Sequence, residues 1–319
     1  MTVCIAGLFK FNYGTIDAPN HGYAAITVSD RKITVGDIEY EPNQTKVAYF
    51  GNCLVLVAGD IAIHTQAIQD TASELKGRNL PSKDIALIYG RAIQAINARY
   101  AESEILAPLG LNTDTFNAQQ KDFSQSFVDT VMAQLQNRQP ADVEALVVGS
   151  NGTRASIYLI DSRGRDYCMD DVGFAAIGIG AWHAKSRLMS VGYVNSRSLA
   201  PTLTALYAAK KGAELAPGVG AATDIRVVLK DENFDLWENV GSELASLYDK
   251  YNARAKSLGD QMISELQSYL DKPQQTQKGA DDKGQGPFSP NAQADGGTSP
   301  DVPEAARKNE TGNGSSQIN

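Results

Sequence analysis

Three residues near the start of this 319-residue chain, Thr2, Asp30 and Lys46, have side chains that could cooperate in hydrolysis. A nucleophilic threonine needs a base, and removal of Met1 would give Thr2 an α-amine with an unperturbed pKa of about 7.7–8.0. A lysine ammonium would lower the pKa values of that amine and of the hydroxyl, and a carboxylate would keep the lysine oriented. The set predicts a threonine nucleophile whose own amine is the base.

Asp30 and Lys46 lie at the ends of two apolar runs, 16 positions apart. Asp30 follows Val28-Ser29, and Lys46 precedes Val47, so a pair of strands would bring the two side chains together. Each of these features also has an explanation without function. An Asp and a Lys on neighbouring strands commonly form a solvated ion pair, and many cytosolic proteins begin with Met-Thr. The site therefore depends on the elements around it.

Short apolar runs closed by Gly, Asn, Asp or Pro predict strands in two groups. They cover residues 3–8, 23–28, 32–35, 45–50, 53–58, 144–148, 155–160, 165–169, 174–177 and 225–229. Apolar residues at intervals of three and four predict helices over 61–76, 82–101, 123–136, 182–192 and 200–214. Ser82 is the expected N-cap and Gly77 the expected stop, while residues 102–120 show weak periodicity and are expected to form a loop.

This order of elements predicts an α+β fold, because runs of strands and runs of helices replace the βαβ alternation of a parallel sheet. We expect a four-layer αββα sandwich, with two stacked antiparallel sheets flanked by helices. The sandwich would occupy residues 1–236, with an insertion at about 102–140. A long amphipathic helix is expected over 237–270, lying on its own domain or at an intersubunit seam, and a polar, disordered tail over 271–319.

The motifs together resemble the proteasome β-subunit family, including the bacterial ring proteases and the ancestral β-like proteins. The 16-position gap from Asp30 to Lys46 matches the family spacing, and the resemblance covers roughly residues 2–73 and 146–229. The segments that carry it are Thr2-Val-Cys-Ile-Ala-Gly, Ser29-Asp30-Arg31, Thr45-Lys46-Val47, Val57-Ala58-Gly59-Asp60 and Ala176-Ile-Gly178-Ile-Gly180-Ala-Trp-His-Ala. The resemblance implies an N-terminal-nucleophile (Ntn) hydrolase fold.

Carried over residue by residue, the resemblance makes Thr2 the nucleophile, Lys46 the cation that lowers the pKa of the amine, and Asp30 its orienting partner. The backbone N–H of Gly59 becomes the oxyanion donor. The implied activity is that of a threonine-type endopeptidase acting on peptides or unfolded proteins, in a homo-oligomeric ring or spiral. The first residues lack the basic region and apolar stretch of a signal peptide, so we expect a cytoplasmic protein. Whether a separate ATPase regulator feeds it does not follow from the sequence.

The same resemblance assigns the substrate-binding residues. Thr34 would offer its backbone to an extended peptide, in the manner of an added strand. Ile33, Val57 and Ile61 would line the specificity pocket, which would then prefer apolar side chains.

Two supports of the family site are absent from the expected positions. Ile179 stands between two glycines where a serine is usual, and the Asp and Ser expected near 216–219 are not there. Glu214 or Asp224 could substitute, but no spacing selects either. The segment between Thr2 and Asp30 is also about a dozen residues longer than usual and suggests an enlarged hairpin.

These departures leave two alternatives to a peptidase. One is a catalytically silent shell or scaffold protein that keeps the fold, and the other is an Ntn enzyme that hydrolyses a non-peptide amide. A retained Met1 would favour the scaffold, because Thr2 would then lack its base.

Composition excludes several other classes. A net charge of −8 without a basic block argues against nucleic acid as a partner, and no run is long and apolar enough to span a membrane. The three histidines show no metal-like spacing, so neither a metal nor an organic cofactor is expected. The three cysteines are expected to be buried free thiols, with Cys4 a packed neighbour of the site or a rival nucleophile.

Overall fold

The computed structural model describes residues 2–15, 18–35, 38–41, 46–150, 154–229 and 233–271. Residues Met1–Asp260 form one compact unit, and a second unit begins at Gln261, inside the last helix. The predicted tail over 271–319 lies outside the described residues from position 272 onward.

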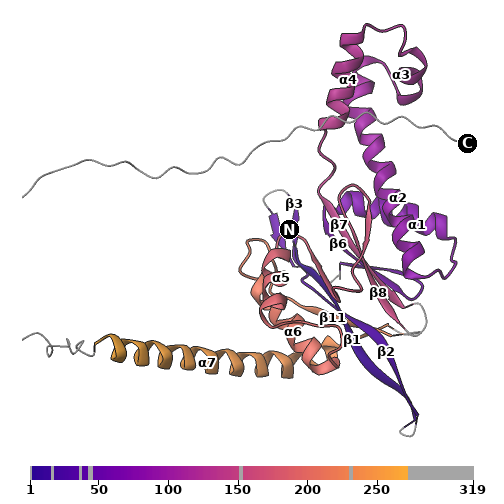
Figure 1. The fold of residues 1–319 in the computed structure, drawn as a ribbon. Coiled ribbons are helices and arrows are strands. Elements are labelled where there is room, and N and C mark those ends of the chain that lie inside the picture. The colour runs from indigo at the N-terminus through magenta and orange to yellow at the C-terminus, as the bar shows by residue number, and fades with distance from the viewer. Residues whose placement is uncertain are drawn as a thin grey trace, which may run out of the picture. The chain divides into compact units, whose positions relative to one another are not determined.

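The fold is α+β, and the described residues form two five-stranded antiparallel sheets and a two-stranded ribbon (Figure 1). The first sheet has the order β10-β1-β2-β11-β12 and the second the order β5-β6-β7-β8-β9, while β3 pairs with β4. The strands are β1 (Cys4–Thr15), β2 (Ala18–Ser29), β3 (Ile33–Val35), β4 (Ile38–Tyr40), β5 (Val47–Phe50), β6 (Cys53–Gly59), β7 (Val143–Ser150), β8 (Ala155–Ile160), β9 (Asp166–Cys168), β10 (Phe174–Ile177), β11 (Asp224–Val228) and β12 (Asn233–Asp235). Both sheets are therefore assembled from segments far apart in the sequence.

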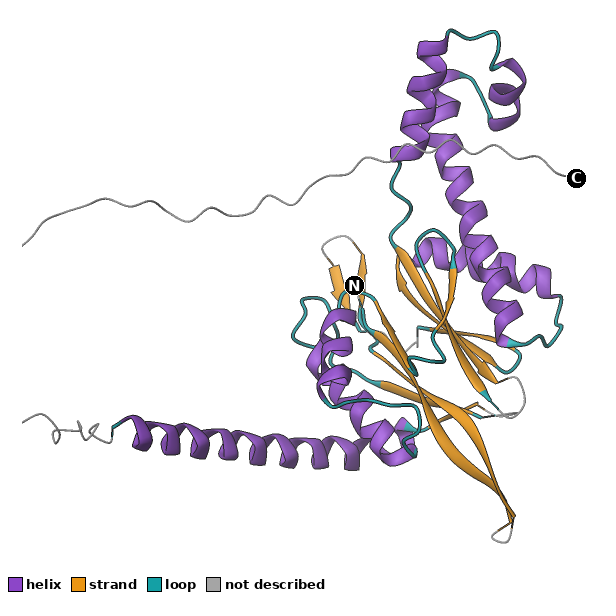
Figure 2. Cartoon of the chain, in the orientation of Figure 1, coloured by secondary structure: helices purple, strands orange, loops and turns teal. Residues whose placement is uncertain are grey.

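Helices lie along the outer face of each sheet (Figure 2). The α-helices are α1 (Ile61–Leu75), α2 (Ser82–Ala101), α3 (Thr113–Gln119), α4 (Gln125–Asn137), α5 (Ala181–Ser190), α6 (Leu199–Ala213) and α7 (Trp237–Leu270). Buried side chains of α5 and α6 pack against the first sheet, and those of α1 and α2 against the second.

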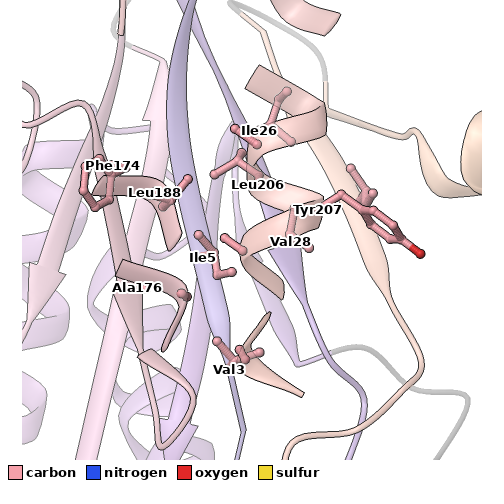
Figure 3. Close-up of a cluster of buried hydrophobic side chains, with 14 of the residues drawn as sticks. Val3, Ile5, Ile26, Val28, Phe174, Ala176, Leu188, Leu206 and Tyr207 are labelled. Carbon is pink, nitrogen blue, oxygen red and sulfur yellow. The ribbon is translucent and has the colours of Figure 1, made fainter. Parts of the chain in front are cut away.

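The first sheet is apolar on both faces, which is why its sequence reads as continuous apolar runs. The side chains of Val3, just before β1, and of Ile5 in β1 join Leu206 of α6 and other residues of one cluster (Figure 3). The alternate residues Cys4 and Leu8 point to the opposite face, toward the second sheet. A strand buried on both faces needs apolar residues at every position.

The second sheet repeats this pattern. In β6, Val55 and Val57 pack against α1 and α2, whereas Leu54 and Leu56 face the first sheet. One cluster of buried side chains thus joins the two sheets, in a layering compatible with the expected sandwich. The hairpin expected between Thr2 and Asp30 is present, since β1 and β2 pair continuously from Cys4 with Ser29 to Thr15 with Ala18.

The prediction of a loop over residues 102–120 is wrong, because most of this segment is helical. A π-helical turn (Glu102–Leu106) continues α2, a 3-10 turn (Ala107–Leu109) follows, and α3 begins after Asn112. The Asn112 side chain accepts a bond from the Thr115 N–H, and the Thr115 hydroxyl oxygen accepts one from the Asn112 N–H. This capping box starts the helix, and a small separate core holds it in place, made of Leu106, Phe116, Val128 and Val131.

Three smaller expectations also need correction. Pro81 is the N-cap of α2, without a side-chain capping bond, and Ser82, the expected N-cap, is the first helical residue. Strand β4 was not predicted, and neither was β12. Cys168 is exposed, whereas Cys4 and Cys53 are buried as expected, because all three residues of the edge strand β9 are exposed.

Helix α7 leaves most of its apolar stripe exposed. Leu244 is buried against the first sheet's cluster, and Tyr248 makes an edge contact with Tyr207 of α6, with ring centroids 5.4 Å apart. Farther along, Tyr251 and Leu258 are exposed. The first turns of the helix therefore lie on its own domain. None of the described helices combines the length and the apolar character needed to cross a membrane.

Candidate active site

Thr2, Asp30 and Lys46 meet at one buried point beside the first residues of β1, the last of β2 and the first of β5. The Lys46 ammonium donates to the Thr2 hydroxyl oxygen at 2.6 Å and to Asp30 Oδ1 at 3.0 Å. The Thr2 hydroxyl in turn donates to the same Asp30 oxygen. All three residues are at most 9 % exposed. The structure thus brings together the three side chains that sequence spacing singled out.

Asp30 organises the site through both carboxylate oxygens. Besides Thr2 and Lys46, its Oδ1 accepts the N–H of Val3 at 3.1 Å, and its Oδ2 accepts the N–H groups of Gly220 at 2.8 Å and Lys32 at 3.3 Å. A fully buried carboxylate requires such compensation, because an unpaired buried charge is costly. These bonds fix the carboxylate from three segments of chain and so fix the lysine that it orients.

A cavity of about 1050 Å³ opens beside the Thr2 hydroxyl. Six of the eight residues predicted for the site line it, and these are Thr2, Ile33, Lys46, Val57, Gly59 and Ile61. Asp30 is not among the lining residues, since it is fully buried. Thr34 belongs to β3 and pairs through its backbone with Glu39 of β4, while its side chain is outside the part of the chain that the structure describes.

Gly59 ends β6 in a conformation that only glycine adopts readily, with φ at +106°. A Cβ built there would lie 2.0 Å from the Asp142 carbonyl oxygen. The absence of a side chain at Gly59 therefore allows the close approach of the segment that leads into β7. Gly59 itself is exposed to the cavity.

The turn Gly178-Ile179-Gly180 lies against the backbone of Thr2. The Gly180 N–H donates to the Thr2 carbonyl at 3.3 Å, and a Cβ on Gly178 would lie 2.4 Å from that same oxygen. Ile179, which occupies the position where a serine is usual, is exposed and lines the cavity. Gly178 is thus required for this close approach, while Ile179 adds an apolar wall.

Glu144 was missed by sequence analysis, although it lines the same cavity. It lies on β7, and its Oε2 accepts the Gly178 N–H at 2.9 Å. The carboxylate thereby ties the second sheet to the turn beside Thr2. An isolated Glu within a strand gives no sequence signal of this kind, because its partner is 34 residues away.

The segment expected to supply an Asp and a Ser contributes a backbone group instead, the Gly220 N–H bonded to Asp30. Neither substitute acid is bonded to Thr2. Glu214 accepts bonds from Lys210 at 2.5 Å and Lys211 at 2.7 Å, and Asp224 accepts the Arg31 Nε–H at 2.9 Å. Both carboxylates are therefore engaged in ion pairs of their own.

The surroundings of the other nucleophile and base candidates argue against them. Burial raises the pKa of the Cys4 thiol to about 12, which keeps it protonated near neutral pH and makes it a packed neighbour. The ring nitrogens of the buried His64 are bonded to Tyr89 and to the Ala58 carbonyl. In the part of the chain that the structure describes, no cluster of three or more His, Cys, Asp or Glu could hold a metal ion.

Comparison with known proteins gave no matching family model and no matching curated protein. The chemistry open to the site therefore rests on its own geometry. A hydroxyl held between an ammonium and a carboxylate at the wall of a cavity can act as a nucleophile where a base is at hand. A freed α-amine on Thr2 would stand on the carbon next to the one bearing that hydroxyl, within reach directly or through one water.

Proposed function

We propose that this protein is a threonine-type peptide hydrolase of the proteasome-like Ntn class, with Thr2 as nucleophile and its α-amine as base after removal of Met1. The observation that carries the proposal is the position of the Lys46 ammonium, 2.6 Å from the Thr2 oxygen and 3.0 Å from a buried carboxylate. A buried cation beside a hydroxyl favours loss of the hydroxyl proton and depresses the pKa of an adjacent amine. The layering of two antiparallel sheets between helices is compatible with this class.

In the proposed reaction the amine takes the hydroxyl proton while the Thr2 oxygen attacks the scissile carbonyl. The Gly59 N–H stabilises the resulting oxyanion. The protonated amine then gives its proton to the leaving amine, which leaves an acyl ester on Thr2. Water, activated by the same amine, hydrolyses this ester and frees the hydroxyl again.

Substrate would lie as an extended peptide along the backbone of Thr34, with one side chain directed toward Ile33, Val57 and Ile61. These apolar lining residues favour an apolar side chain at that position. Self-association into a ring or spiral belongs to the same proposal, and analytical ultracentrifugation of the full chain measures it directly.

A silent scaffold is the second candidate, and one observation favours it. Ile179 takes the place of the usual serine, and the nearest substitute acids, Glu214 and Asp224, are held in other ion pairs. In that case the Asp30, Lys46 and Thr2 set would only stabilise the fold.

Turnover of fluorogenic peptides by wild type and Thr2→Ala separates these candidates. We expect wild type to cleave peptides with an apolar residue before the scissile bond and Thr2→Ala to be inactive. The matched control is Thr71→Ala, which removes a buried threonine of α1 outside the site and should leave turnover unchanged. Equal turnover by Thr2→Ala and wild type contradicts the proposal, and no turnover by either favours the scaffold.

A further inference from the structure

Two buried side chains outside the catalytic set form a short chain of hydrogen bonds that ends at the cavity. His64 of α1 and Tyr89 of α2 are each at most 1 % exposed. The His64 Nδ1 lies 2.7 Å from the Tyr89 oxygen, and its Nε2 lies 2.8 Å from the Ala58 carbonyl oxygen. The second bond matters because Ala58 precedes the oxyanion donor, Gly59.

The partners of the ring determine its tautomer. A carbonyl oxygen can only accept a bond, so Nε2 of His64 must carry a proton and donate to Ala58. Burial lowers the pKa of His64, although the Ala58 bond and the nearby Asp60 carboxylate oppose this effect. The ring is therefore neutral near pH 7, and Nδ1 is an acceptor for the Tyr89 hydroxyl. All three side-chain polar atoms of His64 and Tyr89 thus have a hydrogen-bond partner, as buried polar groups require.

The bond to Ala58 acts directly on the Gly59 N–H, because the Ala58 carbonyl and the Gly59 N–H belong to one planar peptide unit. Holding the carbonyl oxygen sets the rotation of that plane, and polarising it strengthens the N–H as a donor. On the far side of Gly59, the Asp60 N–H donates to the Asp142 carbonyl at 3.0 Å. The peptide groups on both sides of Gly59 are thus anchored.

The direction of the Gly59 N–H follows from strand geometry. The Val57 N–H donates to the Lys46 carbonyl at 3.4 Å, so it points to the edge of β6 on which Lys46 lies. Backbone groups alternate between the two edges along a strand, so the N–H two residues later, that of Gly59, points to the same edge. Gly59 lines the same cavity as Thr2 and Lys46.

From this geometry we infer that His64 is a positioning residue for catalysis: with Tyr89 fixing its tautomer, it holds and polarises the peptide group that presents the oxyanion donor. The inference rests on the proposed function, since it assigns the oxyanion to Gly59. A buried histidine that merely fills the core would not need a donor aimed at this particular carbonyl.

Kinetics of three variants test the inference. His64→Leu removes the donor, His64→Gln keeps an N–H near the place of Nε2, and Tyr89→Phe frees Nδ1. Loss of a whole oxyanion donor costs about 10²–10³ in kcat, so misalignment by His64→Leu should cost on the order of 10-fold or more, with KM nearly unchanged. His64→Gln should retain most of the wild-type kcat, and the kcat of Tyr89→Phe should lie between those of wild type and His64→Leu. A peptide aldehyde forms a tetrahedral adduct that carries the oxyanion. Its affinity for the variants should therefore fall in parallel with kcat/KM.

The matched control is Ala67→Gly, which weakens the same buried face of α1 without touching these bonds. It should lower the melting temperature while leaving kcat unchanged at temperatures where the protein is folded. If Ala67→Gly reduces kcat as much as His64→Leu does, or if His64→Gln fails to rescue it, the effect is only structural and the inference is wrong.

Nuclear magnetic resonance tests the same bonds without reference to activity. In 15N-histidine-labelled protein, Nε2 of His64 should be protonated and Nδ1 bare, with the signal assigned by its loss in His64→Gln. His64→Leu should shift the Gly59 amide nitrogen, whereas Ala67→Gly should not. A proton on Nδ1, or an unmoved Gly59 signal, overturns the inference even if peptides are cleaved. If Thr2→Ala keeps full turnover, the proposed function is wrong. The spectra would still show whether His64 makes the two hydrogen bonds.

Discussion

Asp30 and Lys46, 16 residues apart, form a buried ion pair of 3.0 Å with the Thr2 hydroxyl bonded to both partners. The pair forms because Asp30 directly follows β2 and Lys46 directly precedes β5, so two strand ends meet at one place. Such a pair has two roles, since it compensates two buried charges and holds a cation beside the proposed nucleophile.

Replacing Lys46 by Ala should reduce both turnover and stability. Turnover should fall at least about 10²-fold, the lower end for general-base assistance. Removing one partner of a buried pair costs about 3–5 kcal/mol, because Asp30 is left without its counter-charge. The control is Arg91→Ala, which breaks an exposed pair with Glu74 and should cost about 0–1 kcal/mol. Urea unfolding measures the stability of both variants. Equal, small losses of unfolding free energy in Lys46→Ala and Arg91→Ala would contradict a structural role for the buried pair.

Replacing Gly178 by Ala should disable the site through a steric contact. The added Cβ would lie 2.4 Å from the Thr2 carbonyl oxygen, so Thr2 or the turn must move. Gly110 has a similar positive φ, +74° against +83°, with no atom within 4 Å of a built Cβ. Gly110→Ala therefore reproduces the backbone strain alone. We expect peptidase activity to be lost in Gly178→Ala and retained in Gly110→Ala; equal activities would show that the contact with Thr2 is unimportant.

Stability should depend on pH through His64. Burial lowers the pKa of this ring in the folded protein below its ordinary 6.5, so below about pH 6.5 the unfolded chain binds a proton that the folded chain does not. The contribution of neutral His64 is thus fully present above pH 6.5 and declines as pH falls. The unfolding free energy of wild type minus that of His64→Gln should decrease from pH 7 to pH 5. A difference that is constant over this range would contradict it.

Substitution by Ala should lower the stability of the protein more at Tyr248 than at Tyr251, although both residues lie on α7. Tyr248 packs edge-on against Tyr207, whereas Tyr251 is 57 % exposed. Tyr248→Ala should cost on the order of 1–3 kcal/mol, and Tyr251→Ala about 0.5 kcal/mol or less. Thermal unfolding of the two variants decides this. A large loss for Tyr251→Ala would show that α7 is covered in solution.

The elements that position the site could be read from the sequence because both sheets are buried on two faces. Short continuous apolar runs such as that of β6 are typical of strands with no solvent face, and the strand ends that carry Asp30 and Lys46 follow from them. The helical segment after Glu102 was missed, since a π-helical turn and a seven-residue helix give little periodicity. Its burial depends on Phe116 meeting residues of α4, which is tertiary information.

The remainder of the site could not be predicted for a related reason. Gly220 reaches Asp30 across 190 residues, and Glu144 reaches Gly178 from the other sheet. Neither contact leaves a local pattern. The His64 bond to Ala58 spans only six residues, yet it appears in the sequence as an ordinary helix histidine, because the carbonyl it bonds belongs to the backbone.

The most direct test of the account is covalent labelling with a peptide epoxyketone, followed by peptide mapping. This reagent closes a ring only with a hydroxyl and a free amine on neighbouring carbons, so it reports both groups that the mechanism requires. We predict one adduct, on a terminal peptide that begins at Thr2 and lacks Met1, and no adduct in Thr2→Ala. An unlabelled protein that retains Met1, or an adduct that persists in Thr2→Ala, would contradict the central claim.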